Sequence, residues 1–174
     1  MELLPDFSAL LRWFQTAGLL VPRDLKNLHK RWGNSARARR TIEAVRQLRE
    51  TLRRAVLTWE GHGTVHAATV RELNRLMAQH PMRTKLKLNE TGPVTELWFD
   101  PCEPEDLLAP LAYNAAALFA RADRDRVRKC TTCVGHFYDT SKKGTRRWCS
   151  MQLCGNRAKV AAYAARARHS RIGD

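Results

Sequence analysis

Residues 130–154 have the sequence CTTCVGHFYDTSKKGTRRWCSMQLC, which holds four of the five cysteines of the chain. They form a Cys-x2-Cys pair and a Cys-x4-Cys pair, and fifteen residues lie between the pairs. This spacing is typical of a tetrahedral zinc site, because a short turn aims two sulfurs at one point. Four thiolate ligands leave no position open for water, so the pattern predicts one structural Zn²⁺. The expected ligands are Cys130, Cys133, Cys149 and Cys154.

The sequence leaves other uses of these cysteines open. Disulfides would need an oxidising compartment, and residues 1–14 do not resemble an export signal. Redox chemistry at the first pair would suit a βαβ context, which the sequence pattern lacks. His136 is an alternative metal ligand, and Cys102 has no partner in sequence, which favours a free thiol.

The residues between the two cysteine pairs predict a hairpin. Residues 137–139 are its first arm, 141–145 its tip and 146–148 its return arm. A helix is expected to begin near Cys154, where the positive end of the helix dipole favours a thiolate. A cysteine turn, a hairpin and a helix that share one metal make a treble-clef-like zinc finger.

The net charge of the chain is concentrated in its last third. The 174 residues include 31 Lys and Arg and 17 Asp and Glu, which gives a net charge of +14. Residues 1–120 carry 17 basic and 13 acidic side chains (net +4), and residues 121–174 carry 14 and 4 (net +10). Such an excess favours polyanionic partners, nucleic acid before anionic membrane surfaces. No run of about 18 apolar residues occurs, so no membrane span is expected.

The basic residues around the cysteines form a candidate nucleic-acid-binding surface. Phosphate contacts position such a module on duplex DNA, and Arg and Asn side chains can read base edges. A solvated basic face is the alternative for the whole set. Asn156 could instead cap the helix, and Arg157 could pair with Asp139. The candidate residues are Lys142, Lys143, Arg146, Arg147, Asn156, Arg157, Lys159, Arg166 and Arg168.

The preceding body, residues 1–125, is predicted to be mainly helical. Five segments place apolar residues at helical spacing after a residue that favours a helix start. Residues 61–63 are expected to end the third helix, and Pro110 is expected to split or kink the fifth. The five start residues are Asp6, Pro22, Ser35, Thr64 and Pro104.

A small β-hairpin is expected near residues 84–100. Leu86 and Leu88 alternate with lysines, and residues 91–93 (Thr-Gly-Pro) form a turn signal before a second strand-like run. The predicted fold class is therefore a mainly α domain with one hairpin (α+β), followed at 126–174 by the zinc finger with its basic helix.

The cysteine-rich segment resembles a known family. The run Cys154-Gly155-Asn156-Arg157 follows the two cysteine pairs and Arg146-Arg147-Trp148, and together they resemble the bacterial CGNR zinc finger. The body is similar to the ABATE domain that precedes this finger, by its helix order, hairpin and position. The resemblance implies a transcription regulator of a stress-linked class whose finger binds DNA. It also implies the same four zinc ligands, with Arg146, Arg147, Asn156 and Arg157 at the polar positions of the motif.

The expected function is that of a zinc-dependent, DNA-binding transcription regulator, with an RNA- or ribosome-binding module as the alternative. No enzyme is expected, because the histidines of the body lack partners at catalytic spacing. A homodimer on double-stranded DNA is expected, since a lone finger reads only a few base pairs. The expected location is the cytoplasm, at the nucleoid, and no small-molecule effector can be named. The histidines are His29, His62, His66 and His80.

Overall fold

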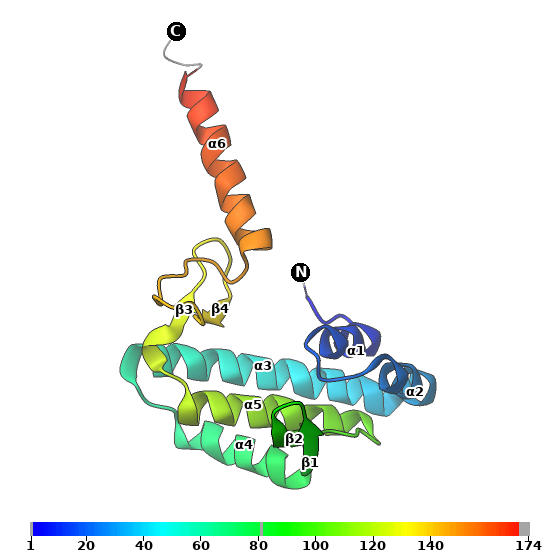
Figure 1. The fold of residues 1–174 in the computed structure, drawn as a ribbon. Coiled ribbons are helices and arrows are strands. Elements are labelled where there is room, and N and C mark those ends of the chain that lie inside the picture. The colour runs from blue at the N-terminus through cyan, green and yellow to red at the C-terminus, as the bar shows by residue number, and fades with distance from the viewer. Residues whose placement is uncertain (1, 81, 171–174) are drawn as a thin grey trace. The chain divides into compact units, whose positions relative to one another are not determined.

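The computed structural model describes residues 2–80 and 82–170, with side chains described through Arg166. The chain divides into two compact units, Met1–Arg121 and Ala122–Asp174. Helices dominate, and the strands form two small antiparallel sheets of two strands each (Figure 1). The predicted fold class is confirmed.

The first unit begins with two short helices, α1 (Phe7–Thr16) and α2 (Pro22–Trp32). Asp6 caps α1, because its Oδ1 accepts a hydrogen bond of 2.7 Å from the backbone N–H of Ala9. The apolar residues at helical spacing on α1 all face the core, as their periodicity predicts. They are Phe7, Leu10, Leu11 and Phe14.

The long helix α3 (Ala36–His62) passes through the centre of the first unit (Figure 1). Ser35 caps it as expected, with its Oγ accepting a 3.0 Å hydrogen bond from the N–H of Ala38. The helix continues through Gly61 and ends at Gly63, whose φ of +71° is left-handed. A helical glycine costs only about 1 kcal/mol, so Gly61 alone does not end the helix. Gly63 ends it because a left-handed cap favours glycine.

Helix α4 (Ala67–Gln79) starts later than predicted. The expected cap, Thr64, lies outside the helix, and the N-cap residue is His66, which makes no side-chain capping bond. His66 still has extended backbone angles, φ −60° and ψ 138°. The helix therefore begins only after His66.

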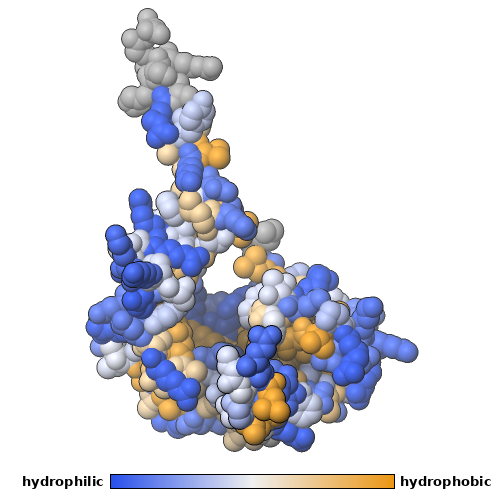
Figure 2. Space-filling model, viewed as in Figure 1, coloured by the Kyte–Doolittle hydropathy of each residue, from blue (hydrophilic) through white to orange (hydrophobic). Residues whose placement is uncertain are grey.

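The predicted hairpin is present. β1 (Arg83–Asn89) pairs antiparallel with β2 (Gly92–Trp98), and Asn89 lies opposite Gly92. Gly92 has a φ of +119°, which explains a glycine at the end of this tight turn. Pro93 belongs to β2 rather than to the turn. In the space-filling view, hydrophobic side chains gather over this hairpin (Figure 2).

A 3-10 turn, η1 (Pro104–Leu107), leads into α5 (Leu108–Arg121). Pro110 lies in the first turn of α5, where its missing N–H removes no bond within the helix, so it does not split the helix. The rings of Trp59 and Phe119 join α3 to α5 in a T-shaped contact with centroids 5.4 Å apart.

The second unit is built from short elements and one helix. A 3-10 turn, η2 (Arg124–Arg126), precedes β3 (Val127–Lys129), which pairs antiparallel with β4 (His136–Tyr138). A π-helical turn, η3 (Met151–Gly155), leads into α6 (Asn156–Ser170). The helix predicted after Cys154 is therefore present.

The strand pairing in the second unit differs from the prediction. β4 pairs with β3, with Tyr138 opposite Val127, and residues 146–148 form no strand. The reason is Asp139, whose carboxylate accepts the N–H of Arg146 at 2.8 Å. The carbonyl of Arg147 accepts the N–H of Thr131 at 3.1 Å, so these backbone groups of the return segment have partners other than β4.

Within the described residues, no helix combines the length and apolar character needed to cross a membrane.

We expect Leu10→Ala to lower the free energy of unfolding of the first unit by about 2–5 kcal/mol, because Leu10 is fully buried and the change leaves a cavity. Leu57→Ala is the matched control, since Leu57 is 41% exposed; it should change stability by about 0.5 kcal/mol or less. Urea unfolding followed by circular dichroism measures both, and equal effects would contradict this core.

Candidate metal centre and basic surface

The first cysteine pair lies in the turn between β3 and β4. Cys130 donates its backbone N–H to the carbonyl of Gly135 at 2.9 Å, which closes the turn. The N–H of Gly135 in turn points at the sulfur of Cys133, 3.4 Å away. The backbone therefore holds both sulfurs on the inner side of the turn, as expected for a Cys-x2-Cys knuckle.

The second pair is positioned by the start of the helical segment. Cys149 donates its N–H to the sulfur of Cys130 at 3.5 Å, which links the two pairs. Cys154 lies in η3, with its N–H donated to the carbonyl of Ser150 at 2.9 Å. It directly precedes α6, whose positive N-terminal end favours a thiolate.

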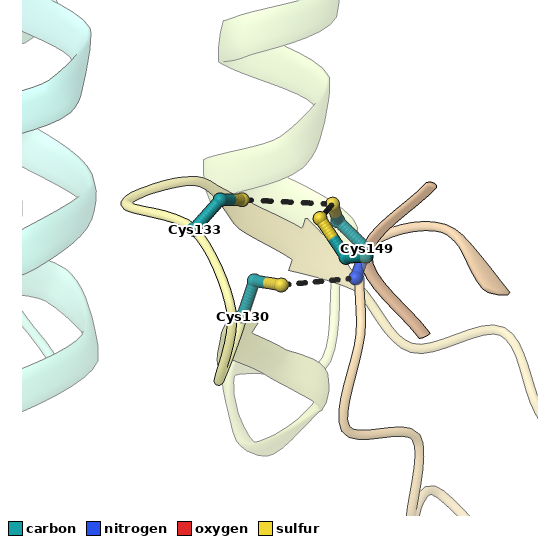
Figure 3. Close-up of side chains that lie close together, drawn as sticks. Cys130, Cys133 and Cys149 are labelled. Atoms are coloured by element: carbon teal, nitrogen blue, oxygen red, sulfur yellow. Dashed lines mark hydrogen bonds between the residues drawn. The ribbon is translucent and has the colours of Figure 1, made fainter. Parts of the chain in front are cut away.

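The four sulfurs form one cluster, in which all lie within 4.8 Å of one another. In Figure 3 the sulfurs of Cys130, Cys133 and Cys149 point toward a common centre. The sulfur of Cys149 is 3.8 Å from that of Cys133 and 3.6 Å from that of Cys154. A disulfide requires about 2.05 Å, whereas four ligands about 2.3 Å from a tetrahedral zinc lie about 3.8 Å apart. The residues present therefore fit a tetrahedral metal ion and not disulfides.

Two residues that the sequence left open are outside this cluster. His136 lies in β4 and is not among the clustered ligand groups of the described chain. Cys102 belongs to the first unit and is an exposed free thiol. The structure thus brings together the four cysteines that the spacing singled out.

The electrostatics of the cluster favour a bound cation. Burial opposes ionisation of Cys130, but backbone N–H groups, that of Cys149 first, lower its pKa to about 6. The hydrogen bond with Cys149, together with burial, raises the pKa of Cys154 to about 12. Burial also raises the pKa of Cys149. Crowded thiols therefore cannot all ionise by themselves, and a divalent cation would stabilise the four thiolates together.

A buried carboxylate, Asp139, organises the loop beside the cluster. Its side chain is fully buried and accepts the N–H groups of Ser141 at 2.9 Å and Arg146 at 2.8 Å. The guanidinium of Arg128 lies 3.6 Å from it. The hydrogen bond with Ser141 lowers the pKa of Asp139, and the N–H of Arg146 and the charge of Arg128 add to this effect. The sequence did not predict this role, although an acid between the cysteine pairs, followed two residues later by serine, is a signal for it.

Arg146 is committed to the interior of the finger. Its Nε donates to the carbonyl of Trp148 at 2.8 Å, and its Nη2 donates to the carbonyl of Cys149. Its guanidinium also lies over the ring of Phe137, 5.2 Å from the centroid. This predicted nucleic-acid residue therefore has a structural task next to a metal ligand.

The remaining basic residues considered for nucleic-acid binding lie in a stretch without acidic residues. Residues 140–170 contain no Asp or Glu. The ion pairs described in the second unit involve Arg124, Arg126 and Arg128, all of which precede this stretch. Exposed basic side chains lie on the loop and on α6, and the space-filling view shows hydrophilic groups along both (Figure 2). They are Lys142, Lys143, Arg147, Arg157, Lys159 and Arg166; the side chain of Arg168 lies outside the described part.

The structural alternatives for Asn156 and Arg157 are not realised in the described part of the chain. Asn156 is the first residue of α6 and is exposed, and the cap that binds an N–H here is Ser150, whose Oγ accepts from Leu153 at 3.3 Å. Arg157 is exposed, and Asp139 is bound by Arg128 instead.

Two large apolar side chains of α6 are exposed. Val160 is 68% and Tyr163 is 70% exposed. Nothing in the described part of the finger packs over them. Both the basic and the apolar flanks of α6 therefore face outward.

Comparison with protein families agrees with this architecture. The model of the CGNR zinc finger matches residues 126–167. The ABATE model, whose description reads "Putative stress-induced transcription regulator", matches residues 1–122. Both are the families that the sequence resembles. A search of curated proteins finds no match to the chain.

We expect Cys149→Ser to abolish tight metal binding and to unfold the finger, because a structural metal supplies on the order of 10 kcal/mol or more of folding energy. Cys102→Ser is the matched control and should keep one metal per chain. Mass spectrometry of the metal content and limited proteolysis of residues 122–170 measure the two effects. Equal metal content in the two variants would contradict the four-cysteine site.

We expect Asp139→Asn to weaken the hydrogen-exchange protection of the amides of Ser141 and Arg146, because the neutral amide replaces a carboxylate acceptor. The folded pKa of Asp139 is lowered, so its contribution is present above the unfolded pKa of about 4 and is lost as the pH falls through the folded value. The difference between wild type and variant should therefore shrink in acid.

The control for this comparison is Asp125→Asn, since the side chain of Asp125 is 85% exposed and pairs only loosely with Arg124. It should leave the hydrogen-exchange protection of the amides of Ser141 and Arg146 unchanged. Unchanged protection in Asp139→Asn at neutral pH would show that the carboxylate does not hold the loop.

Proposed function

The chain belongs to the ABATE family, and from this premise we propose that it is a zinc-dependent regulator of transcription that binds double-stranded DNA through its finger. One observation carries the proposal. Exposed basic side chains flank the four-cysteine cluster in a stretch, residues 140–170, that contains no acidic residue. A solvated face of ordinary composition would carry both basic and acidic side chains. A site for a polyanion needs an excess of basic side chains.

The proposed metal is one Zn²⁺ with a structural role, held by Cys130, Cys133, Cys149 and Cys154. Zinc supplies the positive charge that lets all four thiols ionise, and so it fixes the turn, the loop and the start of α6 relative to one another. With four protein ligands no open coordination position remains for catalysis. We therefore propose a binding function and no enzymatic activity.

In this proposal the loop contacts phosphates, and α6 contacts both phosphates and base edges. Lys142 and Lys143 at the loop tip contact phosphates, as do Lys159 and Arg166, which are seven residues apart and so share a face of α6. Asn156 and Arg157, exposed at the start of α6, are the candidates for base edges. Arg146 holds the finger together, and Arg147 lies over the ring of Trp148, 5.3 Å from the centroid.

RNA is the second candidate ligand, and exposed aromatic rings favour it. Tyr163 is 70% and Tyr138 is 37% exposed, and single-stranded RNA readers stack bases on such rings. Selection from random DNA and RNA pools with the zinc-loaded protein separates the two. Enrichment of a duplex DNA motif supports the proposal, and enrichment confined to RNA replaces it with the second candidate.

In the proposal the protein acts on DNA in the cytoplasm as a homodimer.

The salt dependence of binding is a second test. With about six phosphate contacts, log K should fall with log salt at a slope near −5. Replacing Lys142 and Lys143 together by alanine should weaken binding to all duplexes alike and reduce the slope by about 2. The matched control removes the same charge from α2, by replacing Lys26 and Lys30, and should keep the slope. If the two double variants changed the affinity and the salt slope equally, binding would depend on the total charge of the chain and not on the basic side chains of the finger.

Base reading is tested at the start of α6. Arg157→Ala should change the preferred sequence and cost about 1–3 kcal/mol at the base pair that it reads. Arg166→Ala on the same helix should weaken all sequences similarly. Binding to a panel of single-base variants of the selected site measures both, and an unchanged preference in Arg157→Ala would remove its base-reading role.

A further inference from the structure

The first unit contains a cavity of about 580 Å³ that the proposed DNA contacts do not use. It lies among α1, α3, α5 and the chain segment before α1, so it belongs wholly to the first unit. Its volume falls within the range of about 300–1,000 Å³ that is usual for sites of small organic ligands. The size alone is therefore suited to a ligand rather than to a packing defect.

The lining of this cavity is apolar with a charged group among its residues. Eleven of its thirteen lining residues have apolar side chains, and the two others are Arg49 and Asn114. Arg49 lies on α3, one residue beyond the buried Leu48 and three before Leu52. A site that is apolar with a few placed polar groups orients a ligand by one end. Apolar residues from three helices that face this space include Trp13, Val45, Leu48, Leu52 and Leu111.

Arg49 already holds the carboxylate of Glu2 with its two Nη groups, while its Nε donates to Glu50 at 3.2 Å. Its Nη1 and Nη2 donate to the two oxygens of Glu2 at 2.7 and 2.9 Å, in the bidentate arrangement that guanidinium groups make with carboxylates. Glu2 is followed by Leu3 and Leu4, both of which line the cavity. The chain thus places a carboxylate on Arg49 and apolar side chains next to it in the cavity. A ligand with a carboxylate and an apolar body would make the same two kinds of contact.

The contact between Glu2 and Arg49 is open to a competing carboxylate. The two side chains are 34% and 40% exposed, so a ligand can reach both groups from solvent. Arg46 also holds the next residues, with its Nη2 donated to the carbonyls of Leu4 at 2.8 Å and Pro5 at 2.9 Å, while its Nε lies 3.9 Å from a carboxylate oxygen of Glu2. Glu2 can therefore leave Arg49 while Arg46 keeps the segment before α1 in place.

We propose that this cavity binds a monocarboxylic acid with an apolar body, whose carboxylate replaces that of Glu2 on Arg49. The apolar body lies among the helices, where its burial supplies the driving force, and the guanidinium selects the acid over a neutral or cationic analogue. Glu2 acts as an internal competitor that the ligand displaces. The site is independent of the proposed DNA surface, so its binding can be measured without DNA.

The test is isothermal titration of the full chain with decanoate below its micelle concentration, with decanol and decylamine as probes of equal chain length. Decanoate is expected to bind one to one and more tightly than either analogue. Arg49→Gln should weaken decanoate binding roughly tenfold or more, because a bidentate, charge-assisted contact is lost. It should leave decanol binding unchanged. Arg53→Gln is the matched control, since Arg53 lies one turn further along α3 and pairs with Glu50.

Glu2→Gln is the second variant, and it removes the competitor without touching the core. It should strengthen decanoate binding several-fold and leave decanol unaffected. Quenching of Trp13 by a brominated decanoate, lost in Trp13→Phe, places the ligand in this cavity.

Three outcomes overturn the proposal. They are no decanoate binding by wild type and Glu2→Gln, equal affinities for decanoate and decanol, or equal effects of Arg49→Gln and Arg53→Gln. Each can occur whether or not the finger binds DNA, so failure here is distinct from failure of the proposed function.

Discussion

The finger depends on the convergence of four cysteine sulfurs on one point. In the described part of the second unit the buried hydrophobic side chains are those of Val127, Cys130 and Cys154. Ordering the backbone costs about 1–2 kcal/mol per residue, whereas burying one valine returns only about 1.5–3 kcal/mol. So small a core cannot hold about fifty residues in one conformation. The cysteine cluster supplies the missing constraint, and β3, β4, the loop and the start of α6 all take their positions from it.

Asp139 is the second constraint, and its burial leaves the exposed loop without an acidic side chain. Its carboxylate is buried and bound by two backbone N–H groups and by Arg128. A buried acceptor of this kind costs free energy unless it is fully paired, which it is here. The one acid between the cysteine pairs therefore faces inward and shapes the loop. The exposed positions after it carry Lys142, Lys143 and Arg147 without an opposing charge.

The sequence predicts most of the architecture, because local signals agree with tertiary packing. The caps at Asp6 and Ser35, the apolar period of α1 and the cysteine spacing each act over a few residues, and each is found. The predictions that were wrong depend on the conformation of the folded chain, which local sequence patterns do not contain. Residues 146–148 resemble a strand, but the side chain of Asp139, directly after β4, binds the N–H of Arg146. Thr64 resembles a cap, but the helix begins only after His66. The bidentate contact between Glu2 and Arg49 joins residues 47 positions apart, which no local pattern reveals.

The two units are stabilised by different physical effects, so different changes perturb each of them. The first unit relies on an apolar core that joins α1, α3, α4 and α5, and within its described part no cluster of metal-ligating side chains occurs. Removal of a metal or oxidation of thiolates therefore acts on the finger, whose fold those sulfurs sustain. A ligand that fills the cavity acts on the first unit, by adding apolar contacts to the packing there. Loss of the metal therefore removes the interaction that orders the basic surface, whereas the apolar core of the first unit contains none of the four sulfurs.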